Sequence, residues 1–219
     1  YGAYGFYPRA CEKVVMREVA FKHCGSLGTE TRHNQTATQA EQATYWGSSD
    51  TSDGGAVRFR TIGEVAIHNC EVSYCARGLR LQDCGSDNRA SIVTGCRVYR
   101  TLEAAIYCAA TSYTGSDGCK NMLITGNQVL EPGNNGILVI GGKDITVSHN
   151  NIVRSANAGI QQWHSLDSRI IGNSLFDCNR LSFNLVGSLG DAYGAIVIDG
   201  NSNISPTTLK APPTILVVA

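Results

Sequence analysis

The sequence is poor in charged residues, proline and methionine, and these shortages exclude several classes of protein. Only 16% of its 219 residues are charged, and Lys plus Arg equal Asp plus Glu at 18 each. A chain without net charge has no overall attraction for nucleic acid. No run approaches the about 18 consecutive apolar residues that a membrane helix needs. We therefore expect no nucleic-acid partner and no membrane insertion.

Long helices are not expected either, because glycine is frequent and helical periodicity is nearly absent. The chain has 24 glycines but only five prolines and two methionines, which favours tight turns between short strands. Hydrophobic residues make up 42% of the chain, enough for one sizeable core. The chain begins at Tyr1 with a motif already under way, so we expect a fragment of a longer protein.

The nine cysteines lack the spacing of a zinc site. No Cys-x-x-Cys pair occurs, and an odd number of cysteines cannot pair completely within one chain. We expect free, mostly buried thiols, which suit a protein that folds in a reducing compartment even if it works outside a cell.

A short motif recurs along the chain: an apolar residue, two turn residues, Asn or Cys, a polar residue and a second apolar residue. Its Asn or Cys lies at Cys70, Cys96, Asn127, Asn150 and Asn173, and Phe21-Lys22-His23-Cys24 begins the same pattern. The three Asn are 23 residues apart. Such a residue can stack on its equivalents at the strand spacing of about 4.8 Å, which predicts an internal ladder that includes Cys24.

A second apolar run falls at a fixed phase between these motifs, as in Gly78-Leu79-Arg80-Leu81 and Gly136-Ile137-Leu138-Val139. Three short strands per repeat predict an all-β fold, a right-handed parallel β-helix of about seven coils. We expect one domain over residues 1–205, with inserted loops at 25–54, 109–119 and 176–193. Because prolines interrupt the repeat after Ser205, residues 206–219 are expected to form a C-terminal extension or cap.

Strand alternation places every second residue of the second apolar run on the outer face. One outward column is predicted to contain Tyr7, Arg58, Arg80, Tyr107, Leu138, Gln161 and Val197. The neighbouring column is predicted to contain Arg9, Arg60, Gln82, Ala109, Ile140, Trp163 and Asp199. Arginines stacked about 5 Å apart repel each other unless an anion binds them, so these columns favour an anion-binding groove over a plain solvated surface.

Several residues are candidates for binding a substrate in this groove. Loops on a rigid scaffold commonly carry binding residues, and in the 25–54 loop Tyr45 and Trp46 are expected either to stack on sugar rings or to pack on the coil. The other candidate substrate-binding residues are Arg60, Arg80, Gln82, Gln161, Trp163 and His164.

The first six residues of the opening coil carry a family resemblance. The segment Tyr4-Gly5-Phe6-Tyr7-Pro8-Arg9 resembles the Tyr-Gly-Phe-Asp-Pro-His signature of the mannuronan (alginate) C5-epimerase module, a right-handed β-helix. Tyr7 and Arg9 stand where that family has Asp and His. The family's Tyr, Asp and His are catalytic, so the resemblance implies a catalytic role for Tyr4. The coil pattern is also similar to that of pectate lyases and phage tailspikes.

Enzymes that act on polyuronates first remove the C5 proton beside a carboxyl group, which requires neutralisation of the carboxylate and a base. We therefore expect Arg9, Arg58 and Arg80 to neutralise or bind uronate carboxylates. Tyr4, Tyr7 or Tyr107 is expected to act as base or acid. Reprotonation would give epimerisation, and β-elimination would cleave the chain. Packing or simple sugar stacking is the alternative role of each tyrosine.

Other functions remain open at this point. The coil pattern also fits a tailspike that binds or depolymerises a bacterial surface polysaccharide and that could form a homotrimer. Depolymerisation by hydrolysis would require two carboxylates close together, such as Asp83 and Glu103. A non-catalytic structural or adhesive β-helix is a third reading. An acidic polysaccharide is the expected partner and an extracellular or virion location the expected site of action. No cofactor or metal is expected, although calcium could bridge carboxylates.

Overall fold

Every regular element of the chain is a β-strand within the part that the structure describes. The structure is a computed structural model that describes residues 4–24, 55–110, 118–176, 178, 196–199, 202–204 and 215–218. In these ranges no helix is long and apolar enough to cross a membrane. The predicted all-β class is confirmed.

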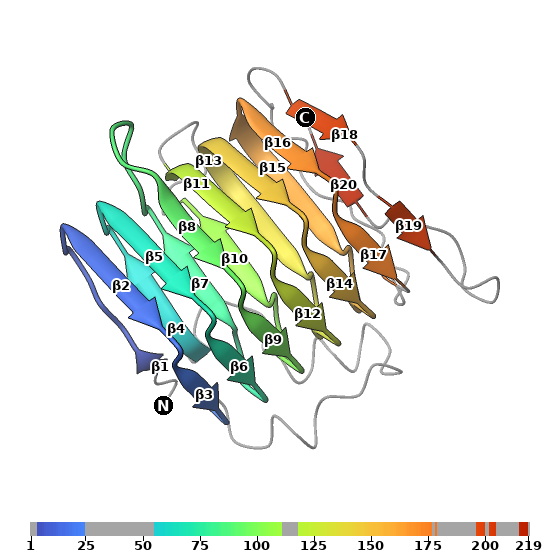
Figure 1. Cartoon of the computed structure of the whole chain (residues 1–219), viewed down its shortest axis with the longest axis horizontal. Coiled ribbons are helices and arrows are strands. Elements are labelled where there is room, and N and C mark those ends of the chain that lie inside the picture. The colour runs from blue at the N-terminus through green and yellow to red at the C-terminus, as the bar shows by residue number, and fades with distance from the viewer. Residues whose placement is uncertain are drawn as a thin grey trace.

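The strands lie in three columns, to each of which successive circuits of the chain add a strand (Figure 1). The first column contains β1 (Tyr4–Phe6), β4 (Gly55–Arg60), β7 (Leu79–Gln82), β10 (Ile106–Ala109), the beginning of β13 (Ile137–Ser148), β15 (Ile160–Leu166) and β20 (Ile215–Val218). The second contains β2 (Lys13–Arg17), β5 (Glu64–His68), β8 (Ser91–Thr94), β11 (Cys119–Thr125), the end of β13, β16 (Ser168–Ile171) and β18 (Ile196–Asp199). The third contains β3 (Ala20–Lys22), β6 (Glu71–Ser73), β9 (Arg97–Tyr99), β12 (Gln128–Leu130), β14 (Asn151–Val153), β17 (Ser174–Phe176) and β19 (Ser202–Ile204).

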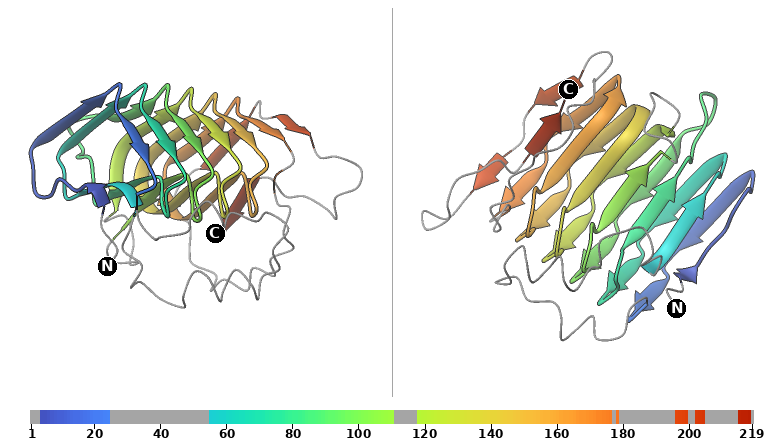
Figure 2. Two further views of the ribbon diagram at one scale, coloured as in Figure 1. Left: turned by 90° about the horizontal axis from the view of Figure 1, so that it is seen from below. Right: turned by 180° about the vertical axis from the view of Figure 1, so that it is seen from behind.

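All pairings between these strands are parallel, and the register repeats from circuit to circuit. Ile106 pairs with Leu79 on one side and with Ile137 on the other. The sheets curl, so that strands of successive circuits lie side by side along the molecule (Figure 2). This arrangement is compatible with the predicted parallel β-helix.

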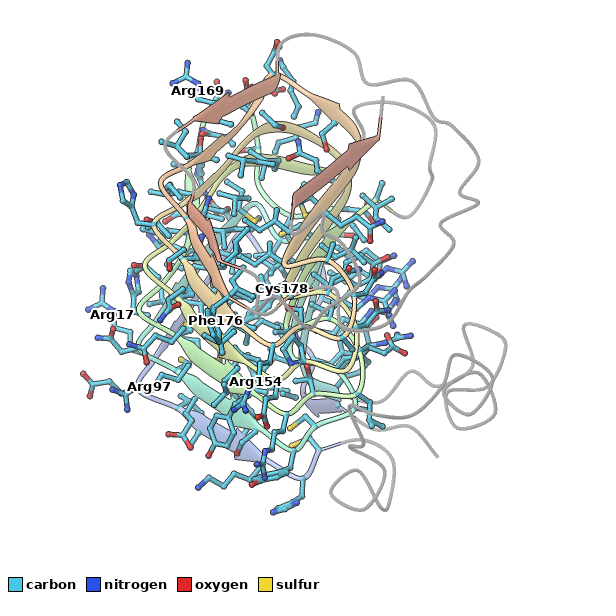
Figure 3. All side chains as sticks on the ribbon, turned by 90° about the vertical axis from the view of Figure 1, so that its right-hand side faces the viewer. Arg17, Arg97, Arg154, Arg169, Phe176 and Cys178 are labelled. Atoms are coloured by element: carbon cyan, nitrogen blue, oxygen red, sulfur yellow. The ribbon has the colours of Figure 1, made fainter. Side chains whose placement is uncertain are left out.

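The core lies inside the curled sheets. The inward residues of the first column from Val57 to Ile160 have no exposed surface, as strand alternation predicts. Phe6 pairs with the inward residue Val57, but 41% of Phe6 is exposed. Because β1 pairs only with β4 among the described strands, Phe6 is covered from one side, by the edge of Phe59. Figure 3 shows side chains, Cys178 among them, filling the enclosed space.

The predicted asparagine ladder is present at the corner between the second and third columns. Nδ2 of Asn127 donates to Oδ1 of Asn150 at 3.0 Å, and Nδ2 of Asn150 donates to Oδ1 of Asn173 at 2.9 Å. The ladder extends to Cys96, whose backbone N–H donates to Oδ1 of Asn127. Cys70 follows in the same column, since its carbonyl accepts from the N–H of Arg97. Buried amides thus stay hydrogen-bonded while the chain turns.

The prediction for Cys24 was wrong. Met16 pairs with Ile67 and Phe21 with Val72, so Val19 is the residue of the first circuit that corresponds to Cys70. Cys24 lies at the next corner, where its backbone N–H donates to Sγ of Cys75. The error arose because the segment before Cys24 has the same apolar–turn–turn order as the ladder motif.

The predicted positions of Val197 and Asp199 were also wrong. Strand β18 pairs with β16, which aligns Val197 with Arg169 and Asp199 with Ile171 in the second column. Leu216 of β20 pairs with Gln161 instead. Alternation identifies a strand without specifying its column, which explains the error. Although β20 extends the first column, the domain boundary at residue 205 stays a prediction.

The cysteines are free thiols, as predicted. Seven of the nine are buried, Cys24 is half-buried and Cys11 is exposed. Burial raises the pKa of the Cys75 thiol to about 12, since an apolar interior disfavours the thiolate. Cys75 therefore acts as a small apolar core residue.

Candidate functional site

The structure brings the predicted arginines and tyrosines of the first column together on its outer face. Arg58 pairs with Arg80, and Arg80 pairs with Tyr107, as the alternation predicted. In the neighbouring outward position, Arg60 pairs with Gln82. Arg9 forms a single backbone bridge to Arg60, which extends this second column into the first circuit.

Tyr4, Tyr7, Arg58, Arg80 and Tyr107 form one cluster, which we call the Tyr/Arg cluster. The rings of Tyr4 and Tyr7 lie 5.7 Å apart between centroids, and the guanidinium of Arg58 lies 5.7 Å and 5.2 Å from these two centroids. Nη1 of Arg80 donates to the Tyr4 hydroxyl at 3.4 Å, while its guanidinium carbon lies 5.4 Å from the Tyr107 centroid. Each arginine therefore interacts with at least one aromatic face.

A glycine lets Tyr4 reach Arg80 across an intervening strand. Tyr4 pairs with Gly55 of β4, whereas Arg80 belongs to β7 on the other side of β4. A Cβ atom on Gly55 would lie 2.9 Å from Cε1 of Tyr4 and 2.9 Å from Cβ of Arg77. Both distances are too short for carbon atoms, so only glycine leaves room for the Tyr4 ring beside Arg77.

Gln82, predicted to bind substrate, contacts Arg58. Nε and Nη2 of Arg58 both donate to Oε1 of Gln82, at 3.2 Å and 2.6 Å. The amide thus fixes the direction of the guanidinium without adding a negative charge. Arg58, Arg80 and Gln82 project from the outer face but are only 6–8% exposed, and low local dielectric strengthens electrostatic interactions there. Tyr7, which is 43% exposed, forms the accessible side of the cluster.

An ion pair that sequence reasoning did not assign to the cluster lies beside Tyr4. Arg77 donates to both carboxylate oxygens of Glu103, from Nε to Oε2 and from Nη2 to Oε1. Burial disfavours the Arg77 cation, but the hydrogen bonds and the charge of Glu103 outweigh burial and raise the pKa of Arg77. The interaction with the Tyr4 hydroxyl also raises the pKa of Arg77. The sequence held a signal, because Arg77 and Glu103 are 26 residues apart, like Cys70 and Cys96.

The carboxylates considered for glycoside hydrolysis do not converge. Glu103 binds Arg77 before the beginning of β7, whereas Asp83 follows the end of β7. About six residues of extended chain separate the two positions, on the order of 20 Å. A hydrolase instead needs its two carboxyl groups within about 10 Å. The interpretation of Asp83 and Glu103 as a hydrolytic pair is therefore wrong.

Among the remaining candidate residues, Gln161 is not brought to the cluster. Gln161 lies in the predicted outward column, but three strand pairings separate it from Arg80, about 14 Å at the usual strand spacing. Trp163 pairs with Ile140 through its backbone, while the side chains of Trp163 and His164 lie outside the described part of the chain, as do Tyr45 and Trp46. Within the described ranges, no three His, Cys, Asp or Glu side chains gather as metal ligands would.

Comparisons of the chain with protein-family models, with curated proteins and with solved structures find no match.

Proposed function

We propose that the chain is a right-handed parallel β-helix that binds an acidic polysaccharide and removes the C5 proton of a uronate residue. β-Elimination or epimerisation then follows. The three strand columns, their parallel pairing and the asparagine ladder support the fold. The Tyr/Arg cluster supports the chemistry, because it combines a candidate base with two buried cations.

The contact of the Tyr4 hydroxyl with Arg80 carries the proposal. A phenol can take a proton only as tyrosinate, and a guanidinium that already donates to its oxygen stabilises that anion. The guanidinium of Arg58 stacks on the Tyr4 ring and places a second positive charge near it. A uronate carboxylate bound to Arg58 would become easier to convert to the enolate form, because the arginine compensates its negative charge.

The proposed reaction begins with transfer of the C5 proton to Tyr4. The Tyr4 oxygen takes the C5 proton, and the electron pair of the broken C–H bond moves toward the neutralised carboxyl group. In elimination, this electron pair forms a double bond between C4 and C5 while the C4–O bond breaks, and the leaving oxygen takes a proton. In epimerisation, C5 instead receives a proton on its opposite face.

Tyr7 and Tyr107 are the candidates for the second proton transfer. Tyr7 is the most exposed tyrosine of the cluster, and Tyr107 lies beyond Arg80 along the column. Arg9 and Arg60, paired through their backbones, would bind a neighbouring carboxylate of the polymer. The whole reaction would take place outside a cell.

Product analysis on a panel of polyuronates tests this proposal. Polymannuronate, polyguluronate and polygalacturonate are incubated separately with the protein and examined by proton NMR. Unsaturated chain ends identify a lyase, and a changed ratio of C5 epimers identifies an epimerase. Unchanged polymers throughout the panel would refute C5-proton abstraction from these substrates.

The free thiols and two exposed apolar residues favour a second candidate, a tailspike that binds a bacterial surface polysaccharide. Nine unpaired cysteines suit folding in a reducing cytosol. Leu130 and Phe176 are 38% and 42% exposed in the third column, on the circuits on either side of Val153, and they would pack in a subunit interface. The molar mass in solution separates the candidates, because a tailspike would form a trimer.

A further inference from the structure

The Arg77–Glu103 pair is built differently from the ion pairs of Glu131, which also join circuits through two carboxylate oxygens. Glu131 bridges Arg100 and Arg154, two arginines that are 47% and 41% exposed. By contrast, the Arg77 side chain is 11% exposed, and the Glu103 carboxylate accepts hydrogen bonds from two of its nitrogen atoms. Burying such a pair costs desolvation energy, so it contributes little net stability compared with apolar packing. A role beyond stability is therefore worth testing.

The position of this pair suggests that role. The Tyr4 ring crosses Gly55 close to the base of the Arg77 side chain, since a Cβ atom added to Gly55 would lie 2.9 Å from Cε1 of Tyr4 and 2.9 Å from Cβ of Arg77. The Tyr4 hydroxyl accepts a hydrogen bond from Arg80, and its interaction with Arg77 helps to raise the pKa of that arginine. Arg77 cannot swing away from Tyr4 without breaking its two hydrogen bonds to Glu103.

We propose that Arg77, anchored by Glu103, is a positioning residue that holds the Tyr4 hydroxyl against Arg80 and keeps a second cation beside it. This inference rests on the proposed function of Tyr4 as the base. Arg77 acts through Tyr4 and does not touch the substrate. Glu103 in turn acts through Arg77, so both residues contribute to the rate of proton removal and little to substrate binding.

The key variant is Glu103→Gln, which removes the negative charge and leaves one acceptor for Arg77. With an active polyuronate, kcat is expected to fall about 10- to 100-fold, since a misplacement of about 1 Å at a reacting group can cost 100-fold. KM is expected to stay within about twofold, because binding is unchanged when only the transition state is affected.

Two further variants control for simple loss of structure. Glu131→Gln removes a comparable carboxylate that bridges circuits on the third column, and it should leave kcat and KM unchanged. Arg77→Lys keeps the cation but loses the planar fork that binds Glu103. It should lower kcat less than Glu103→Gln does. If Glu103→Gln and Glu131→Gln behave alike, the positioning role is wrong.

A second readout does not depend on turnover. In the unmodified protein, NMR should show cross-relaxation between the Tyr4 ring and the α-protons of Gly55, and Glu103→Gln should weaken it while Glu131→Gln should not. If the unmodified protein leaves every polyuronate unchanged, the proposed function fails. The cross-relaxation measurement still tests whether Glu103 and Arg77 hold the Tyr4 ring over Gly55. Cross-relaxation that persists in Glu103→Gln at full strength would overturn the inference.

Discussion

The Tyr4 hydroxyl accepts a hydrogen bond from Nη1 of Arg80 at 3.4 Å, although the two residues lie 76 positions apart in the chain. Strand β4 separates their strands, so the contact exists only because Gly55 places no side chain between them. The contact therefore depends on the parallel register of three successive circuits. It couples the fold directly to the chemistry that we propose.

Tyr4→Phe should abolish turnover without unfolding the protein. The substitution removes only the hydroxyl that accepts from Arg80 and keeps the ring that stacks with Tyr7 and Arg58. Loss of a general base typically costs about 100- to 10,000-fold in rate. The measurement is the initial rate on the active polyuronate beside a thermal unfolding curve. Retention of more than a tenth of the rate would contradict the assignment of Tyr4.

Arg80→Ala should weaken polyuronate binding more than the loss of an arginine on another face. Arg80 lies in the Tyr/Arg cluster, whereas Arg169 is exposed in the second column and points away from the sheets (Figure 3). A charge-assisted hydrogen bond contributes about 2 kcal/mol, so Arg80→Ala should raise the dissociation constant about 10- to 30-fold. Isothermal titration calorimetry measures both variants, and equal losses for Arg80→Ala and Arg169→Ala would argue for non-specific attraction.

Asn150→Ala should destabilise the fold strongly. The Asn150 side chain donates to the carbonyl of Ile124 and to Asn173, and it accepts from the backbone and side chain of Asn127. Each buried polar group left without a partner costs about 1–3 kcal/mol, so a loss of at least about 3 kcal/mol is expected. The next residue, Asn151, is exposed, and Asn151→Ala is the matched control. Urea unfolding monitored by circular dichroism compares the two.

The contribution of the buried Cys75 thiol to stability should be lost at alkaline pH. The pKa of Cys75 is about 12 in the folded protein and 9.0 ordinarily, so the folded state holds this proton more tightly than the unfolded chain. The resulting stabilisation is complete below pH 9.0 and is lost as the pH rises toward about 12. Cys75→Ala should therefore lose stability less steeply than the unmodified protein above pH 9.0. Parallel pH slopes for the two proteins would contradict this prediction.

Thiol reagents offer an independent check on the same burial. In the folded protein, exposed Cys11 should react first and half-buried Cys24 more slowly. The seven buried thiols should react only after unfolding. Mass spectrometry after brief alkylation identifies the modified residues. Rapid modification of Cys96 or Cys119, which have no exposed surface, would contradict the packing of the core.

Much of the scaffold could be predicted from the sequence because its physical cause is local. Alternation fixes which residues face inward, so the pairing of Arg58 with Arg80 and of Arg80 with Tyr107 followed from spacing alone. The asparagine ladder was predictable for the same reason. Cys24 and Val197 were misplaced because a short motif identifies a strand or a corner without specifying which one.

The parts of the site that the sequence did not predict depend on contacts between circuits. Gly55 begins one of the second apolar runs and Arg77 precedes the next, but the importance of both residues comes from the direction in which Tyr4 leaves its strand. Gln82 was predicted to bind substrate, yet its Oε1 accepts two hydrogen bonds from Arg58. Side-chain direction and long-range pairing of this kind follow from three-dimensional packing.

Deuterium incorporation at C5 tests the central claim most directly. Polyuronates are incubated in deuterated water with the unmodified protein and with Tyr4→Phe, and the C5 proton signal is followed by NMR. We predict loss of this signal with the unmodified protein and its persistence with Tyr4→Phe. A C5 signal that persists on every polyuronate with the unmodified protein would contradict proton abstraction by the Tyr/Arg cluster.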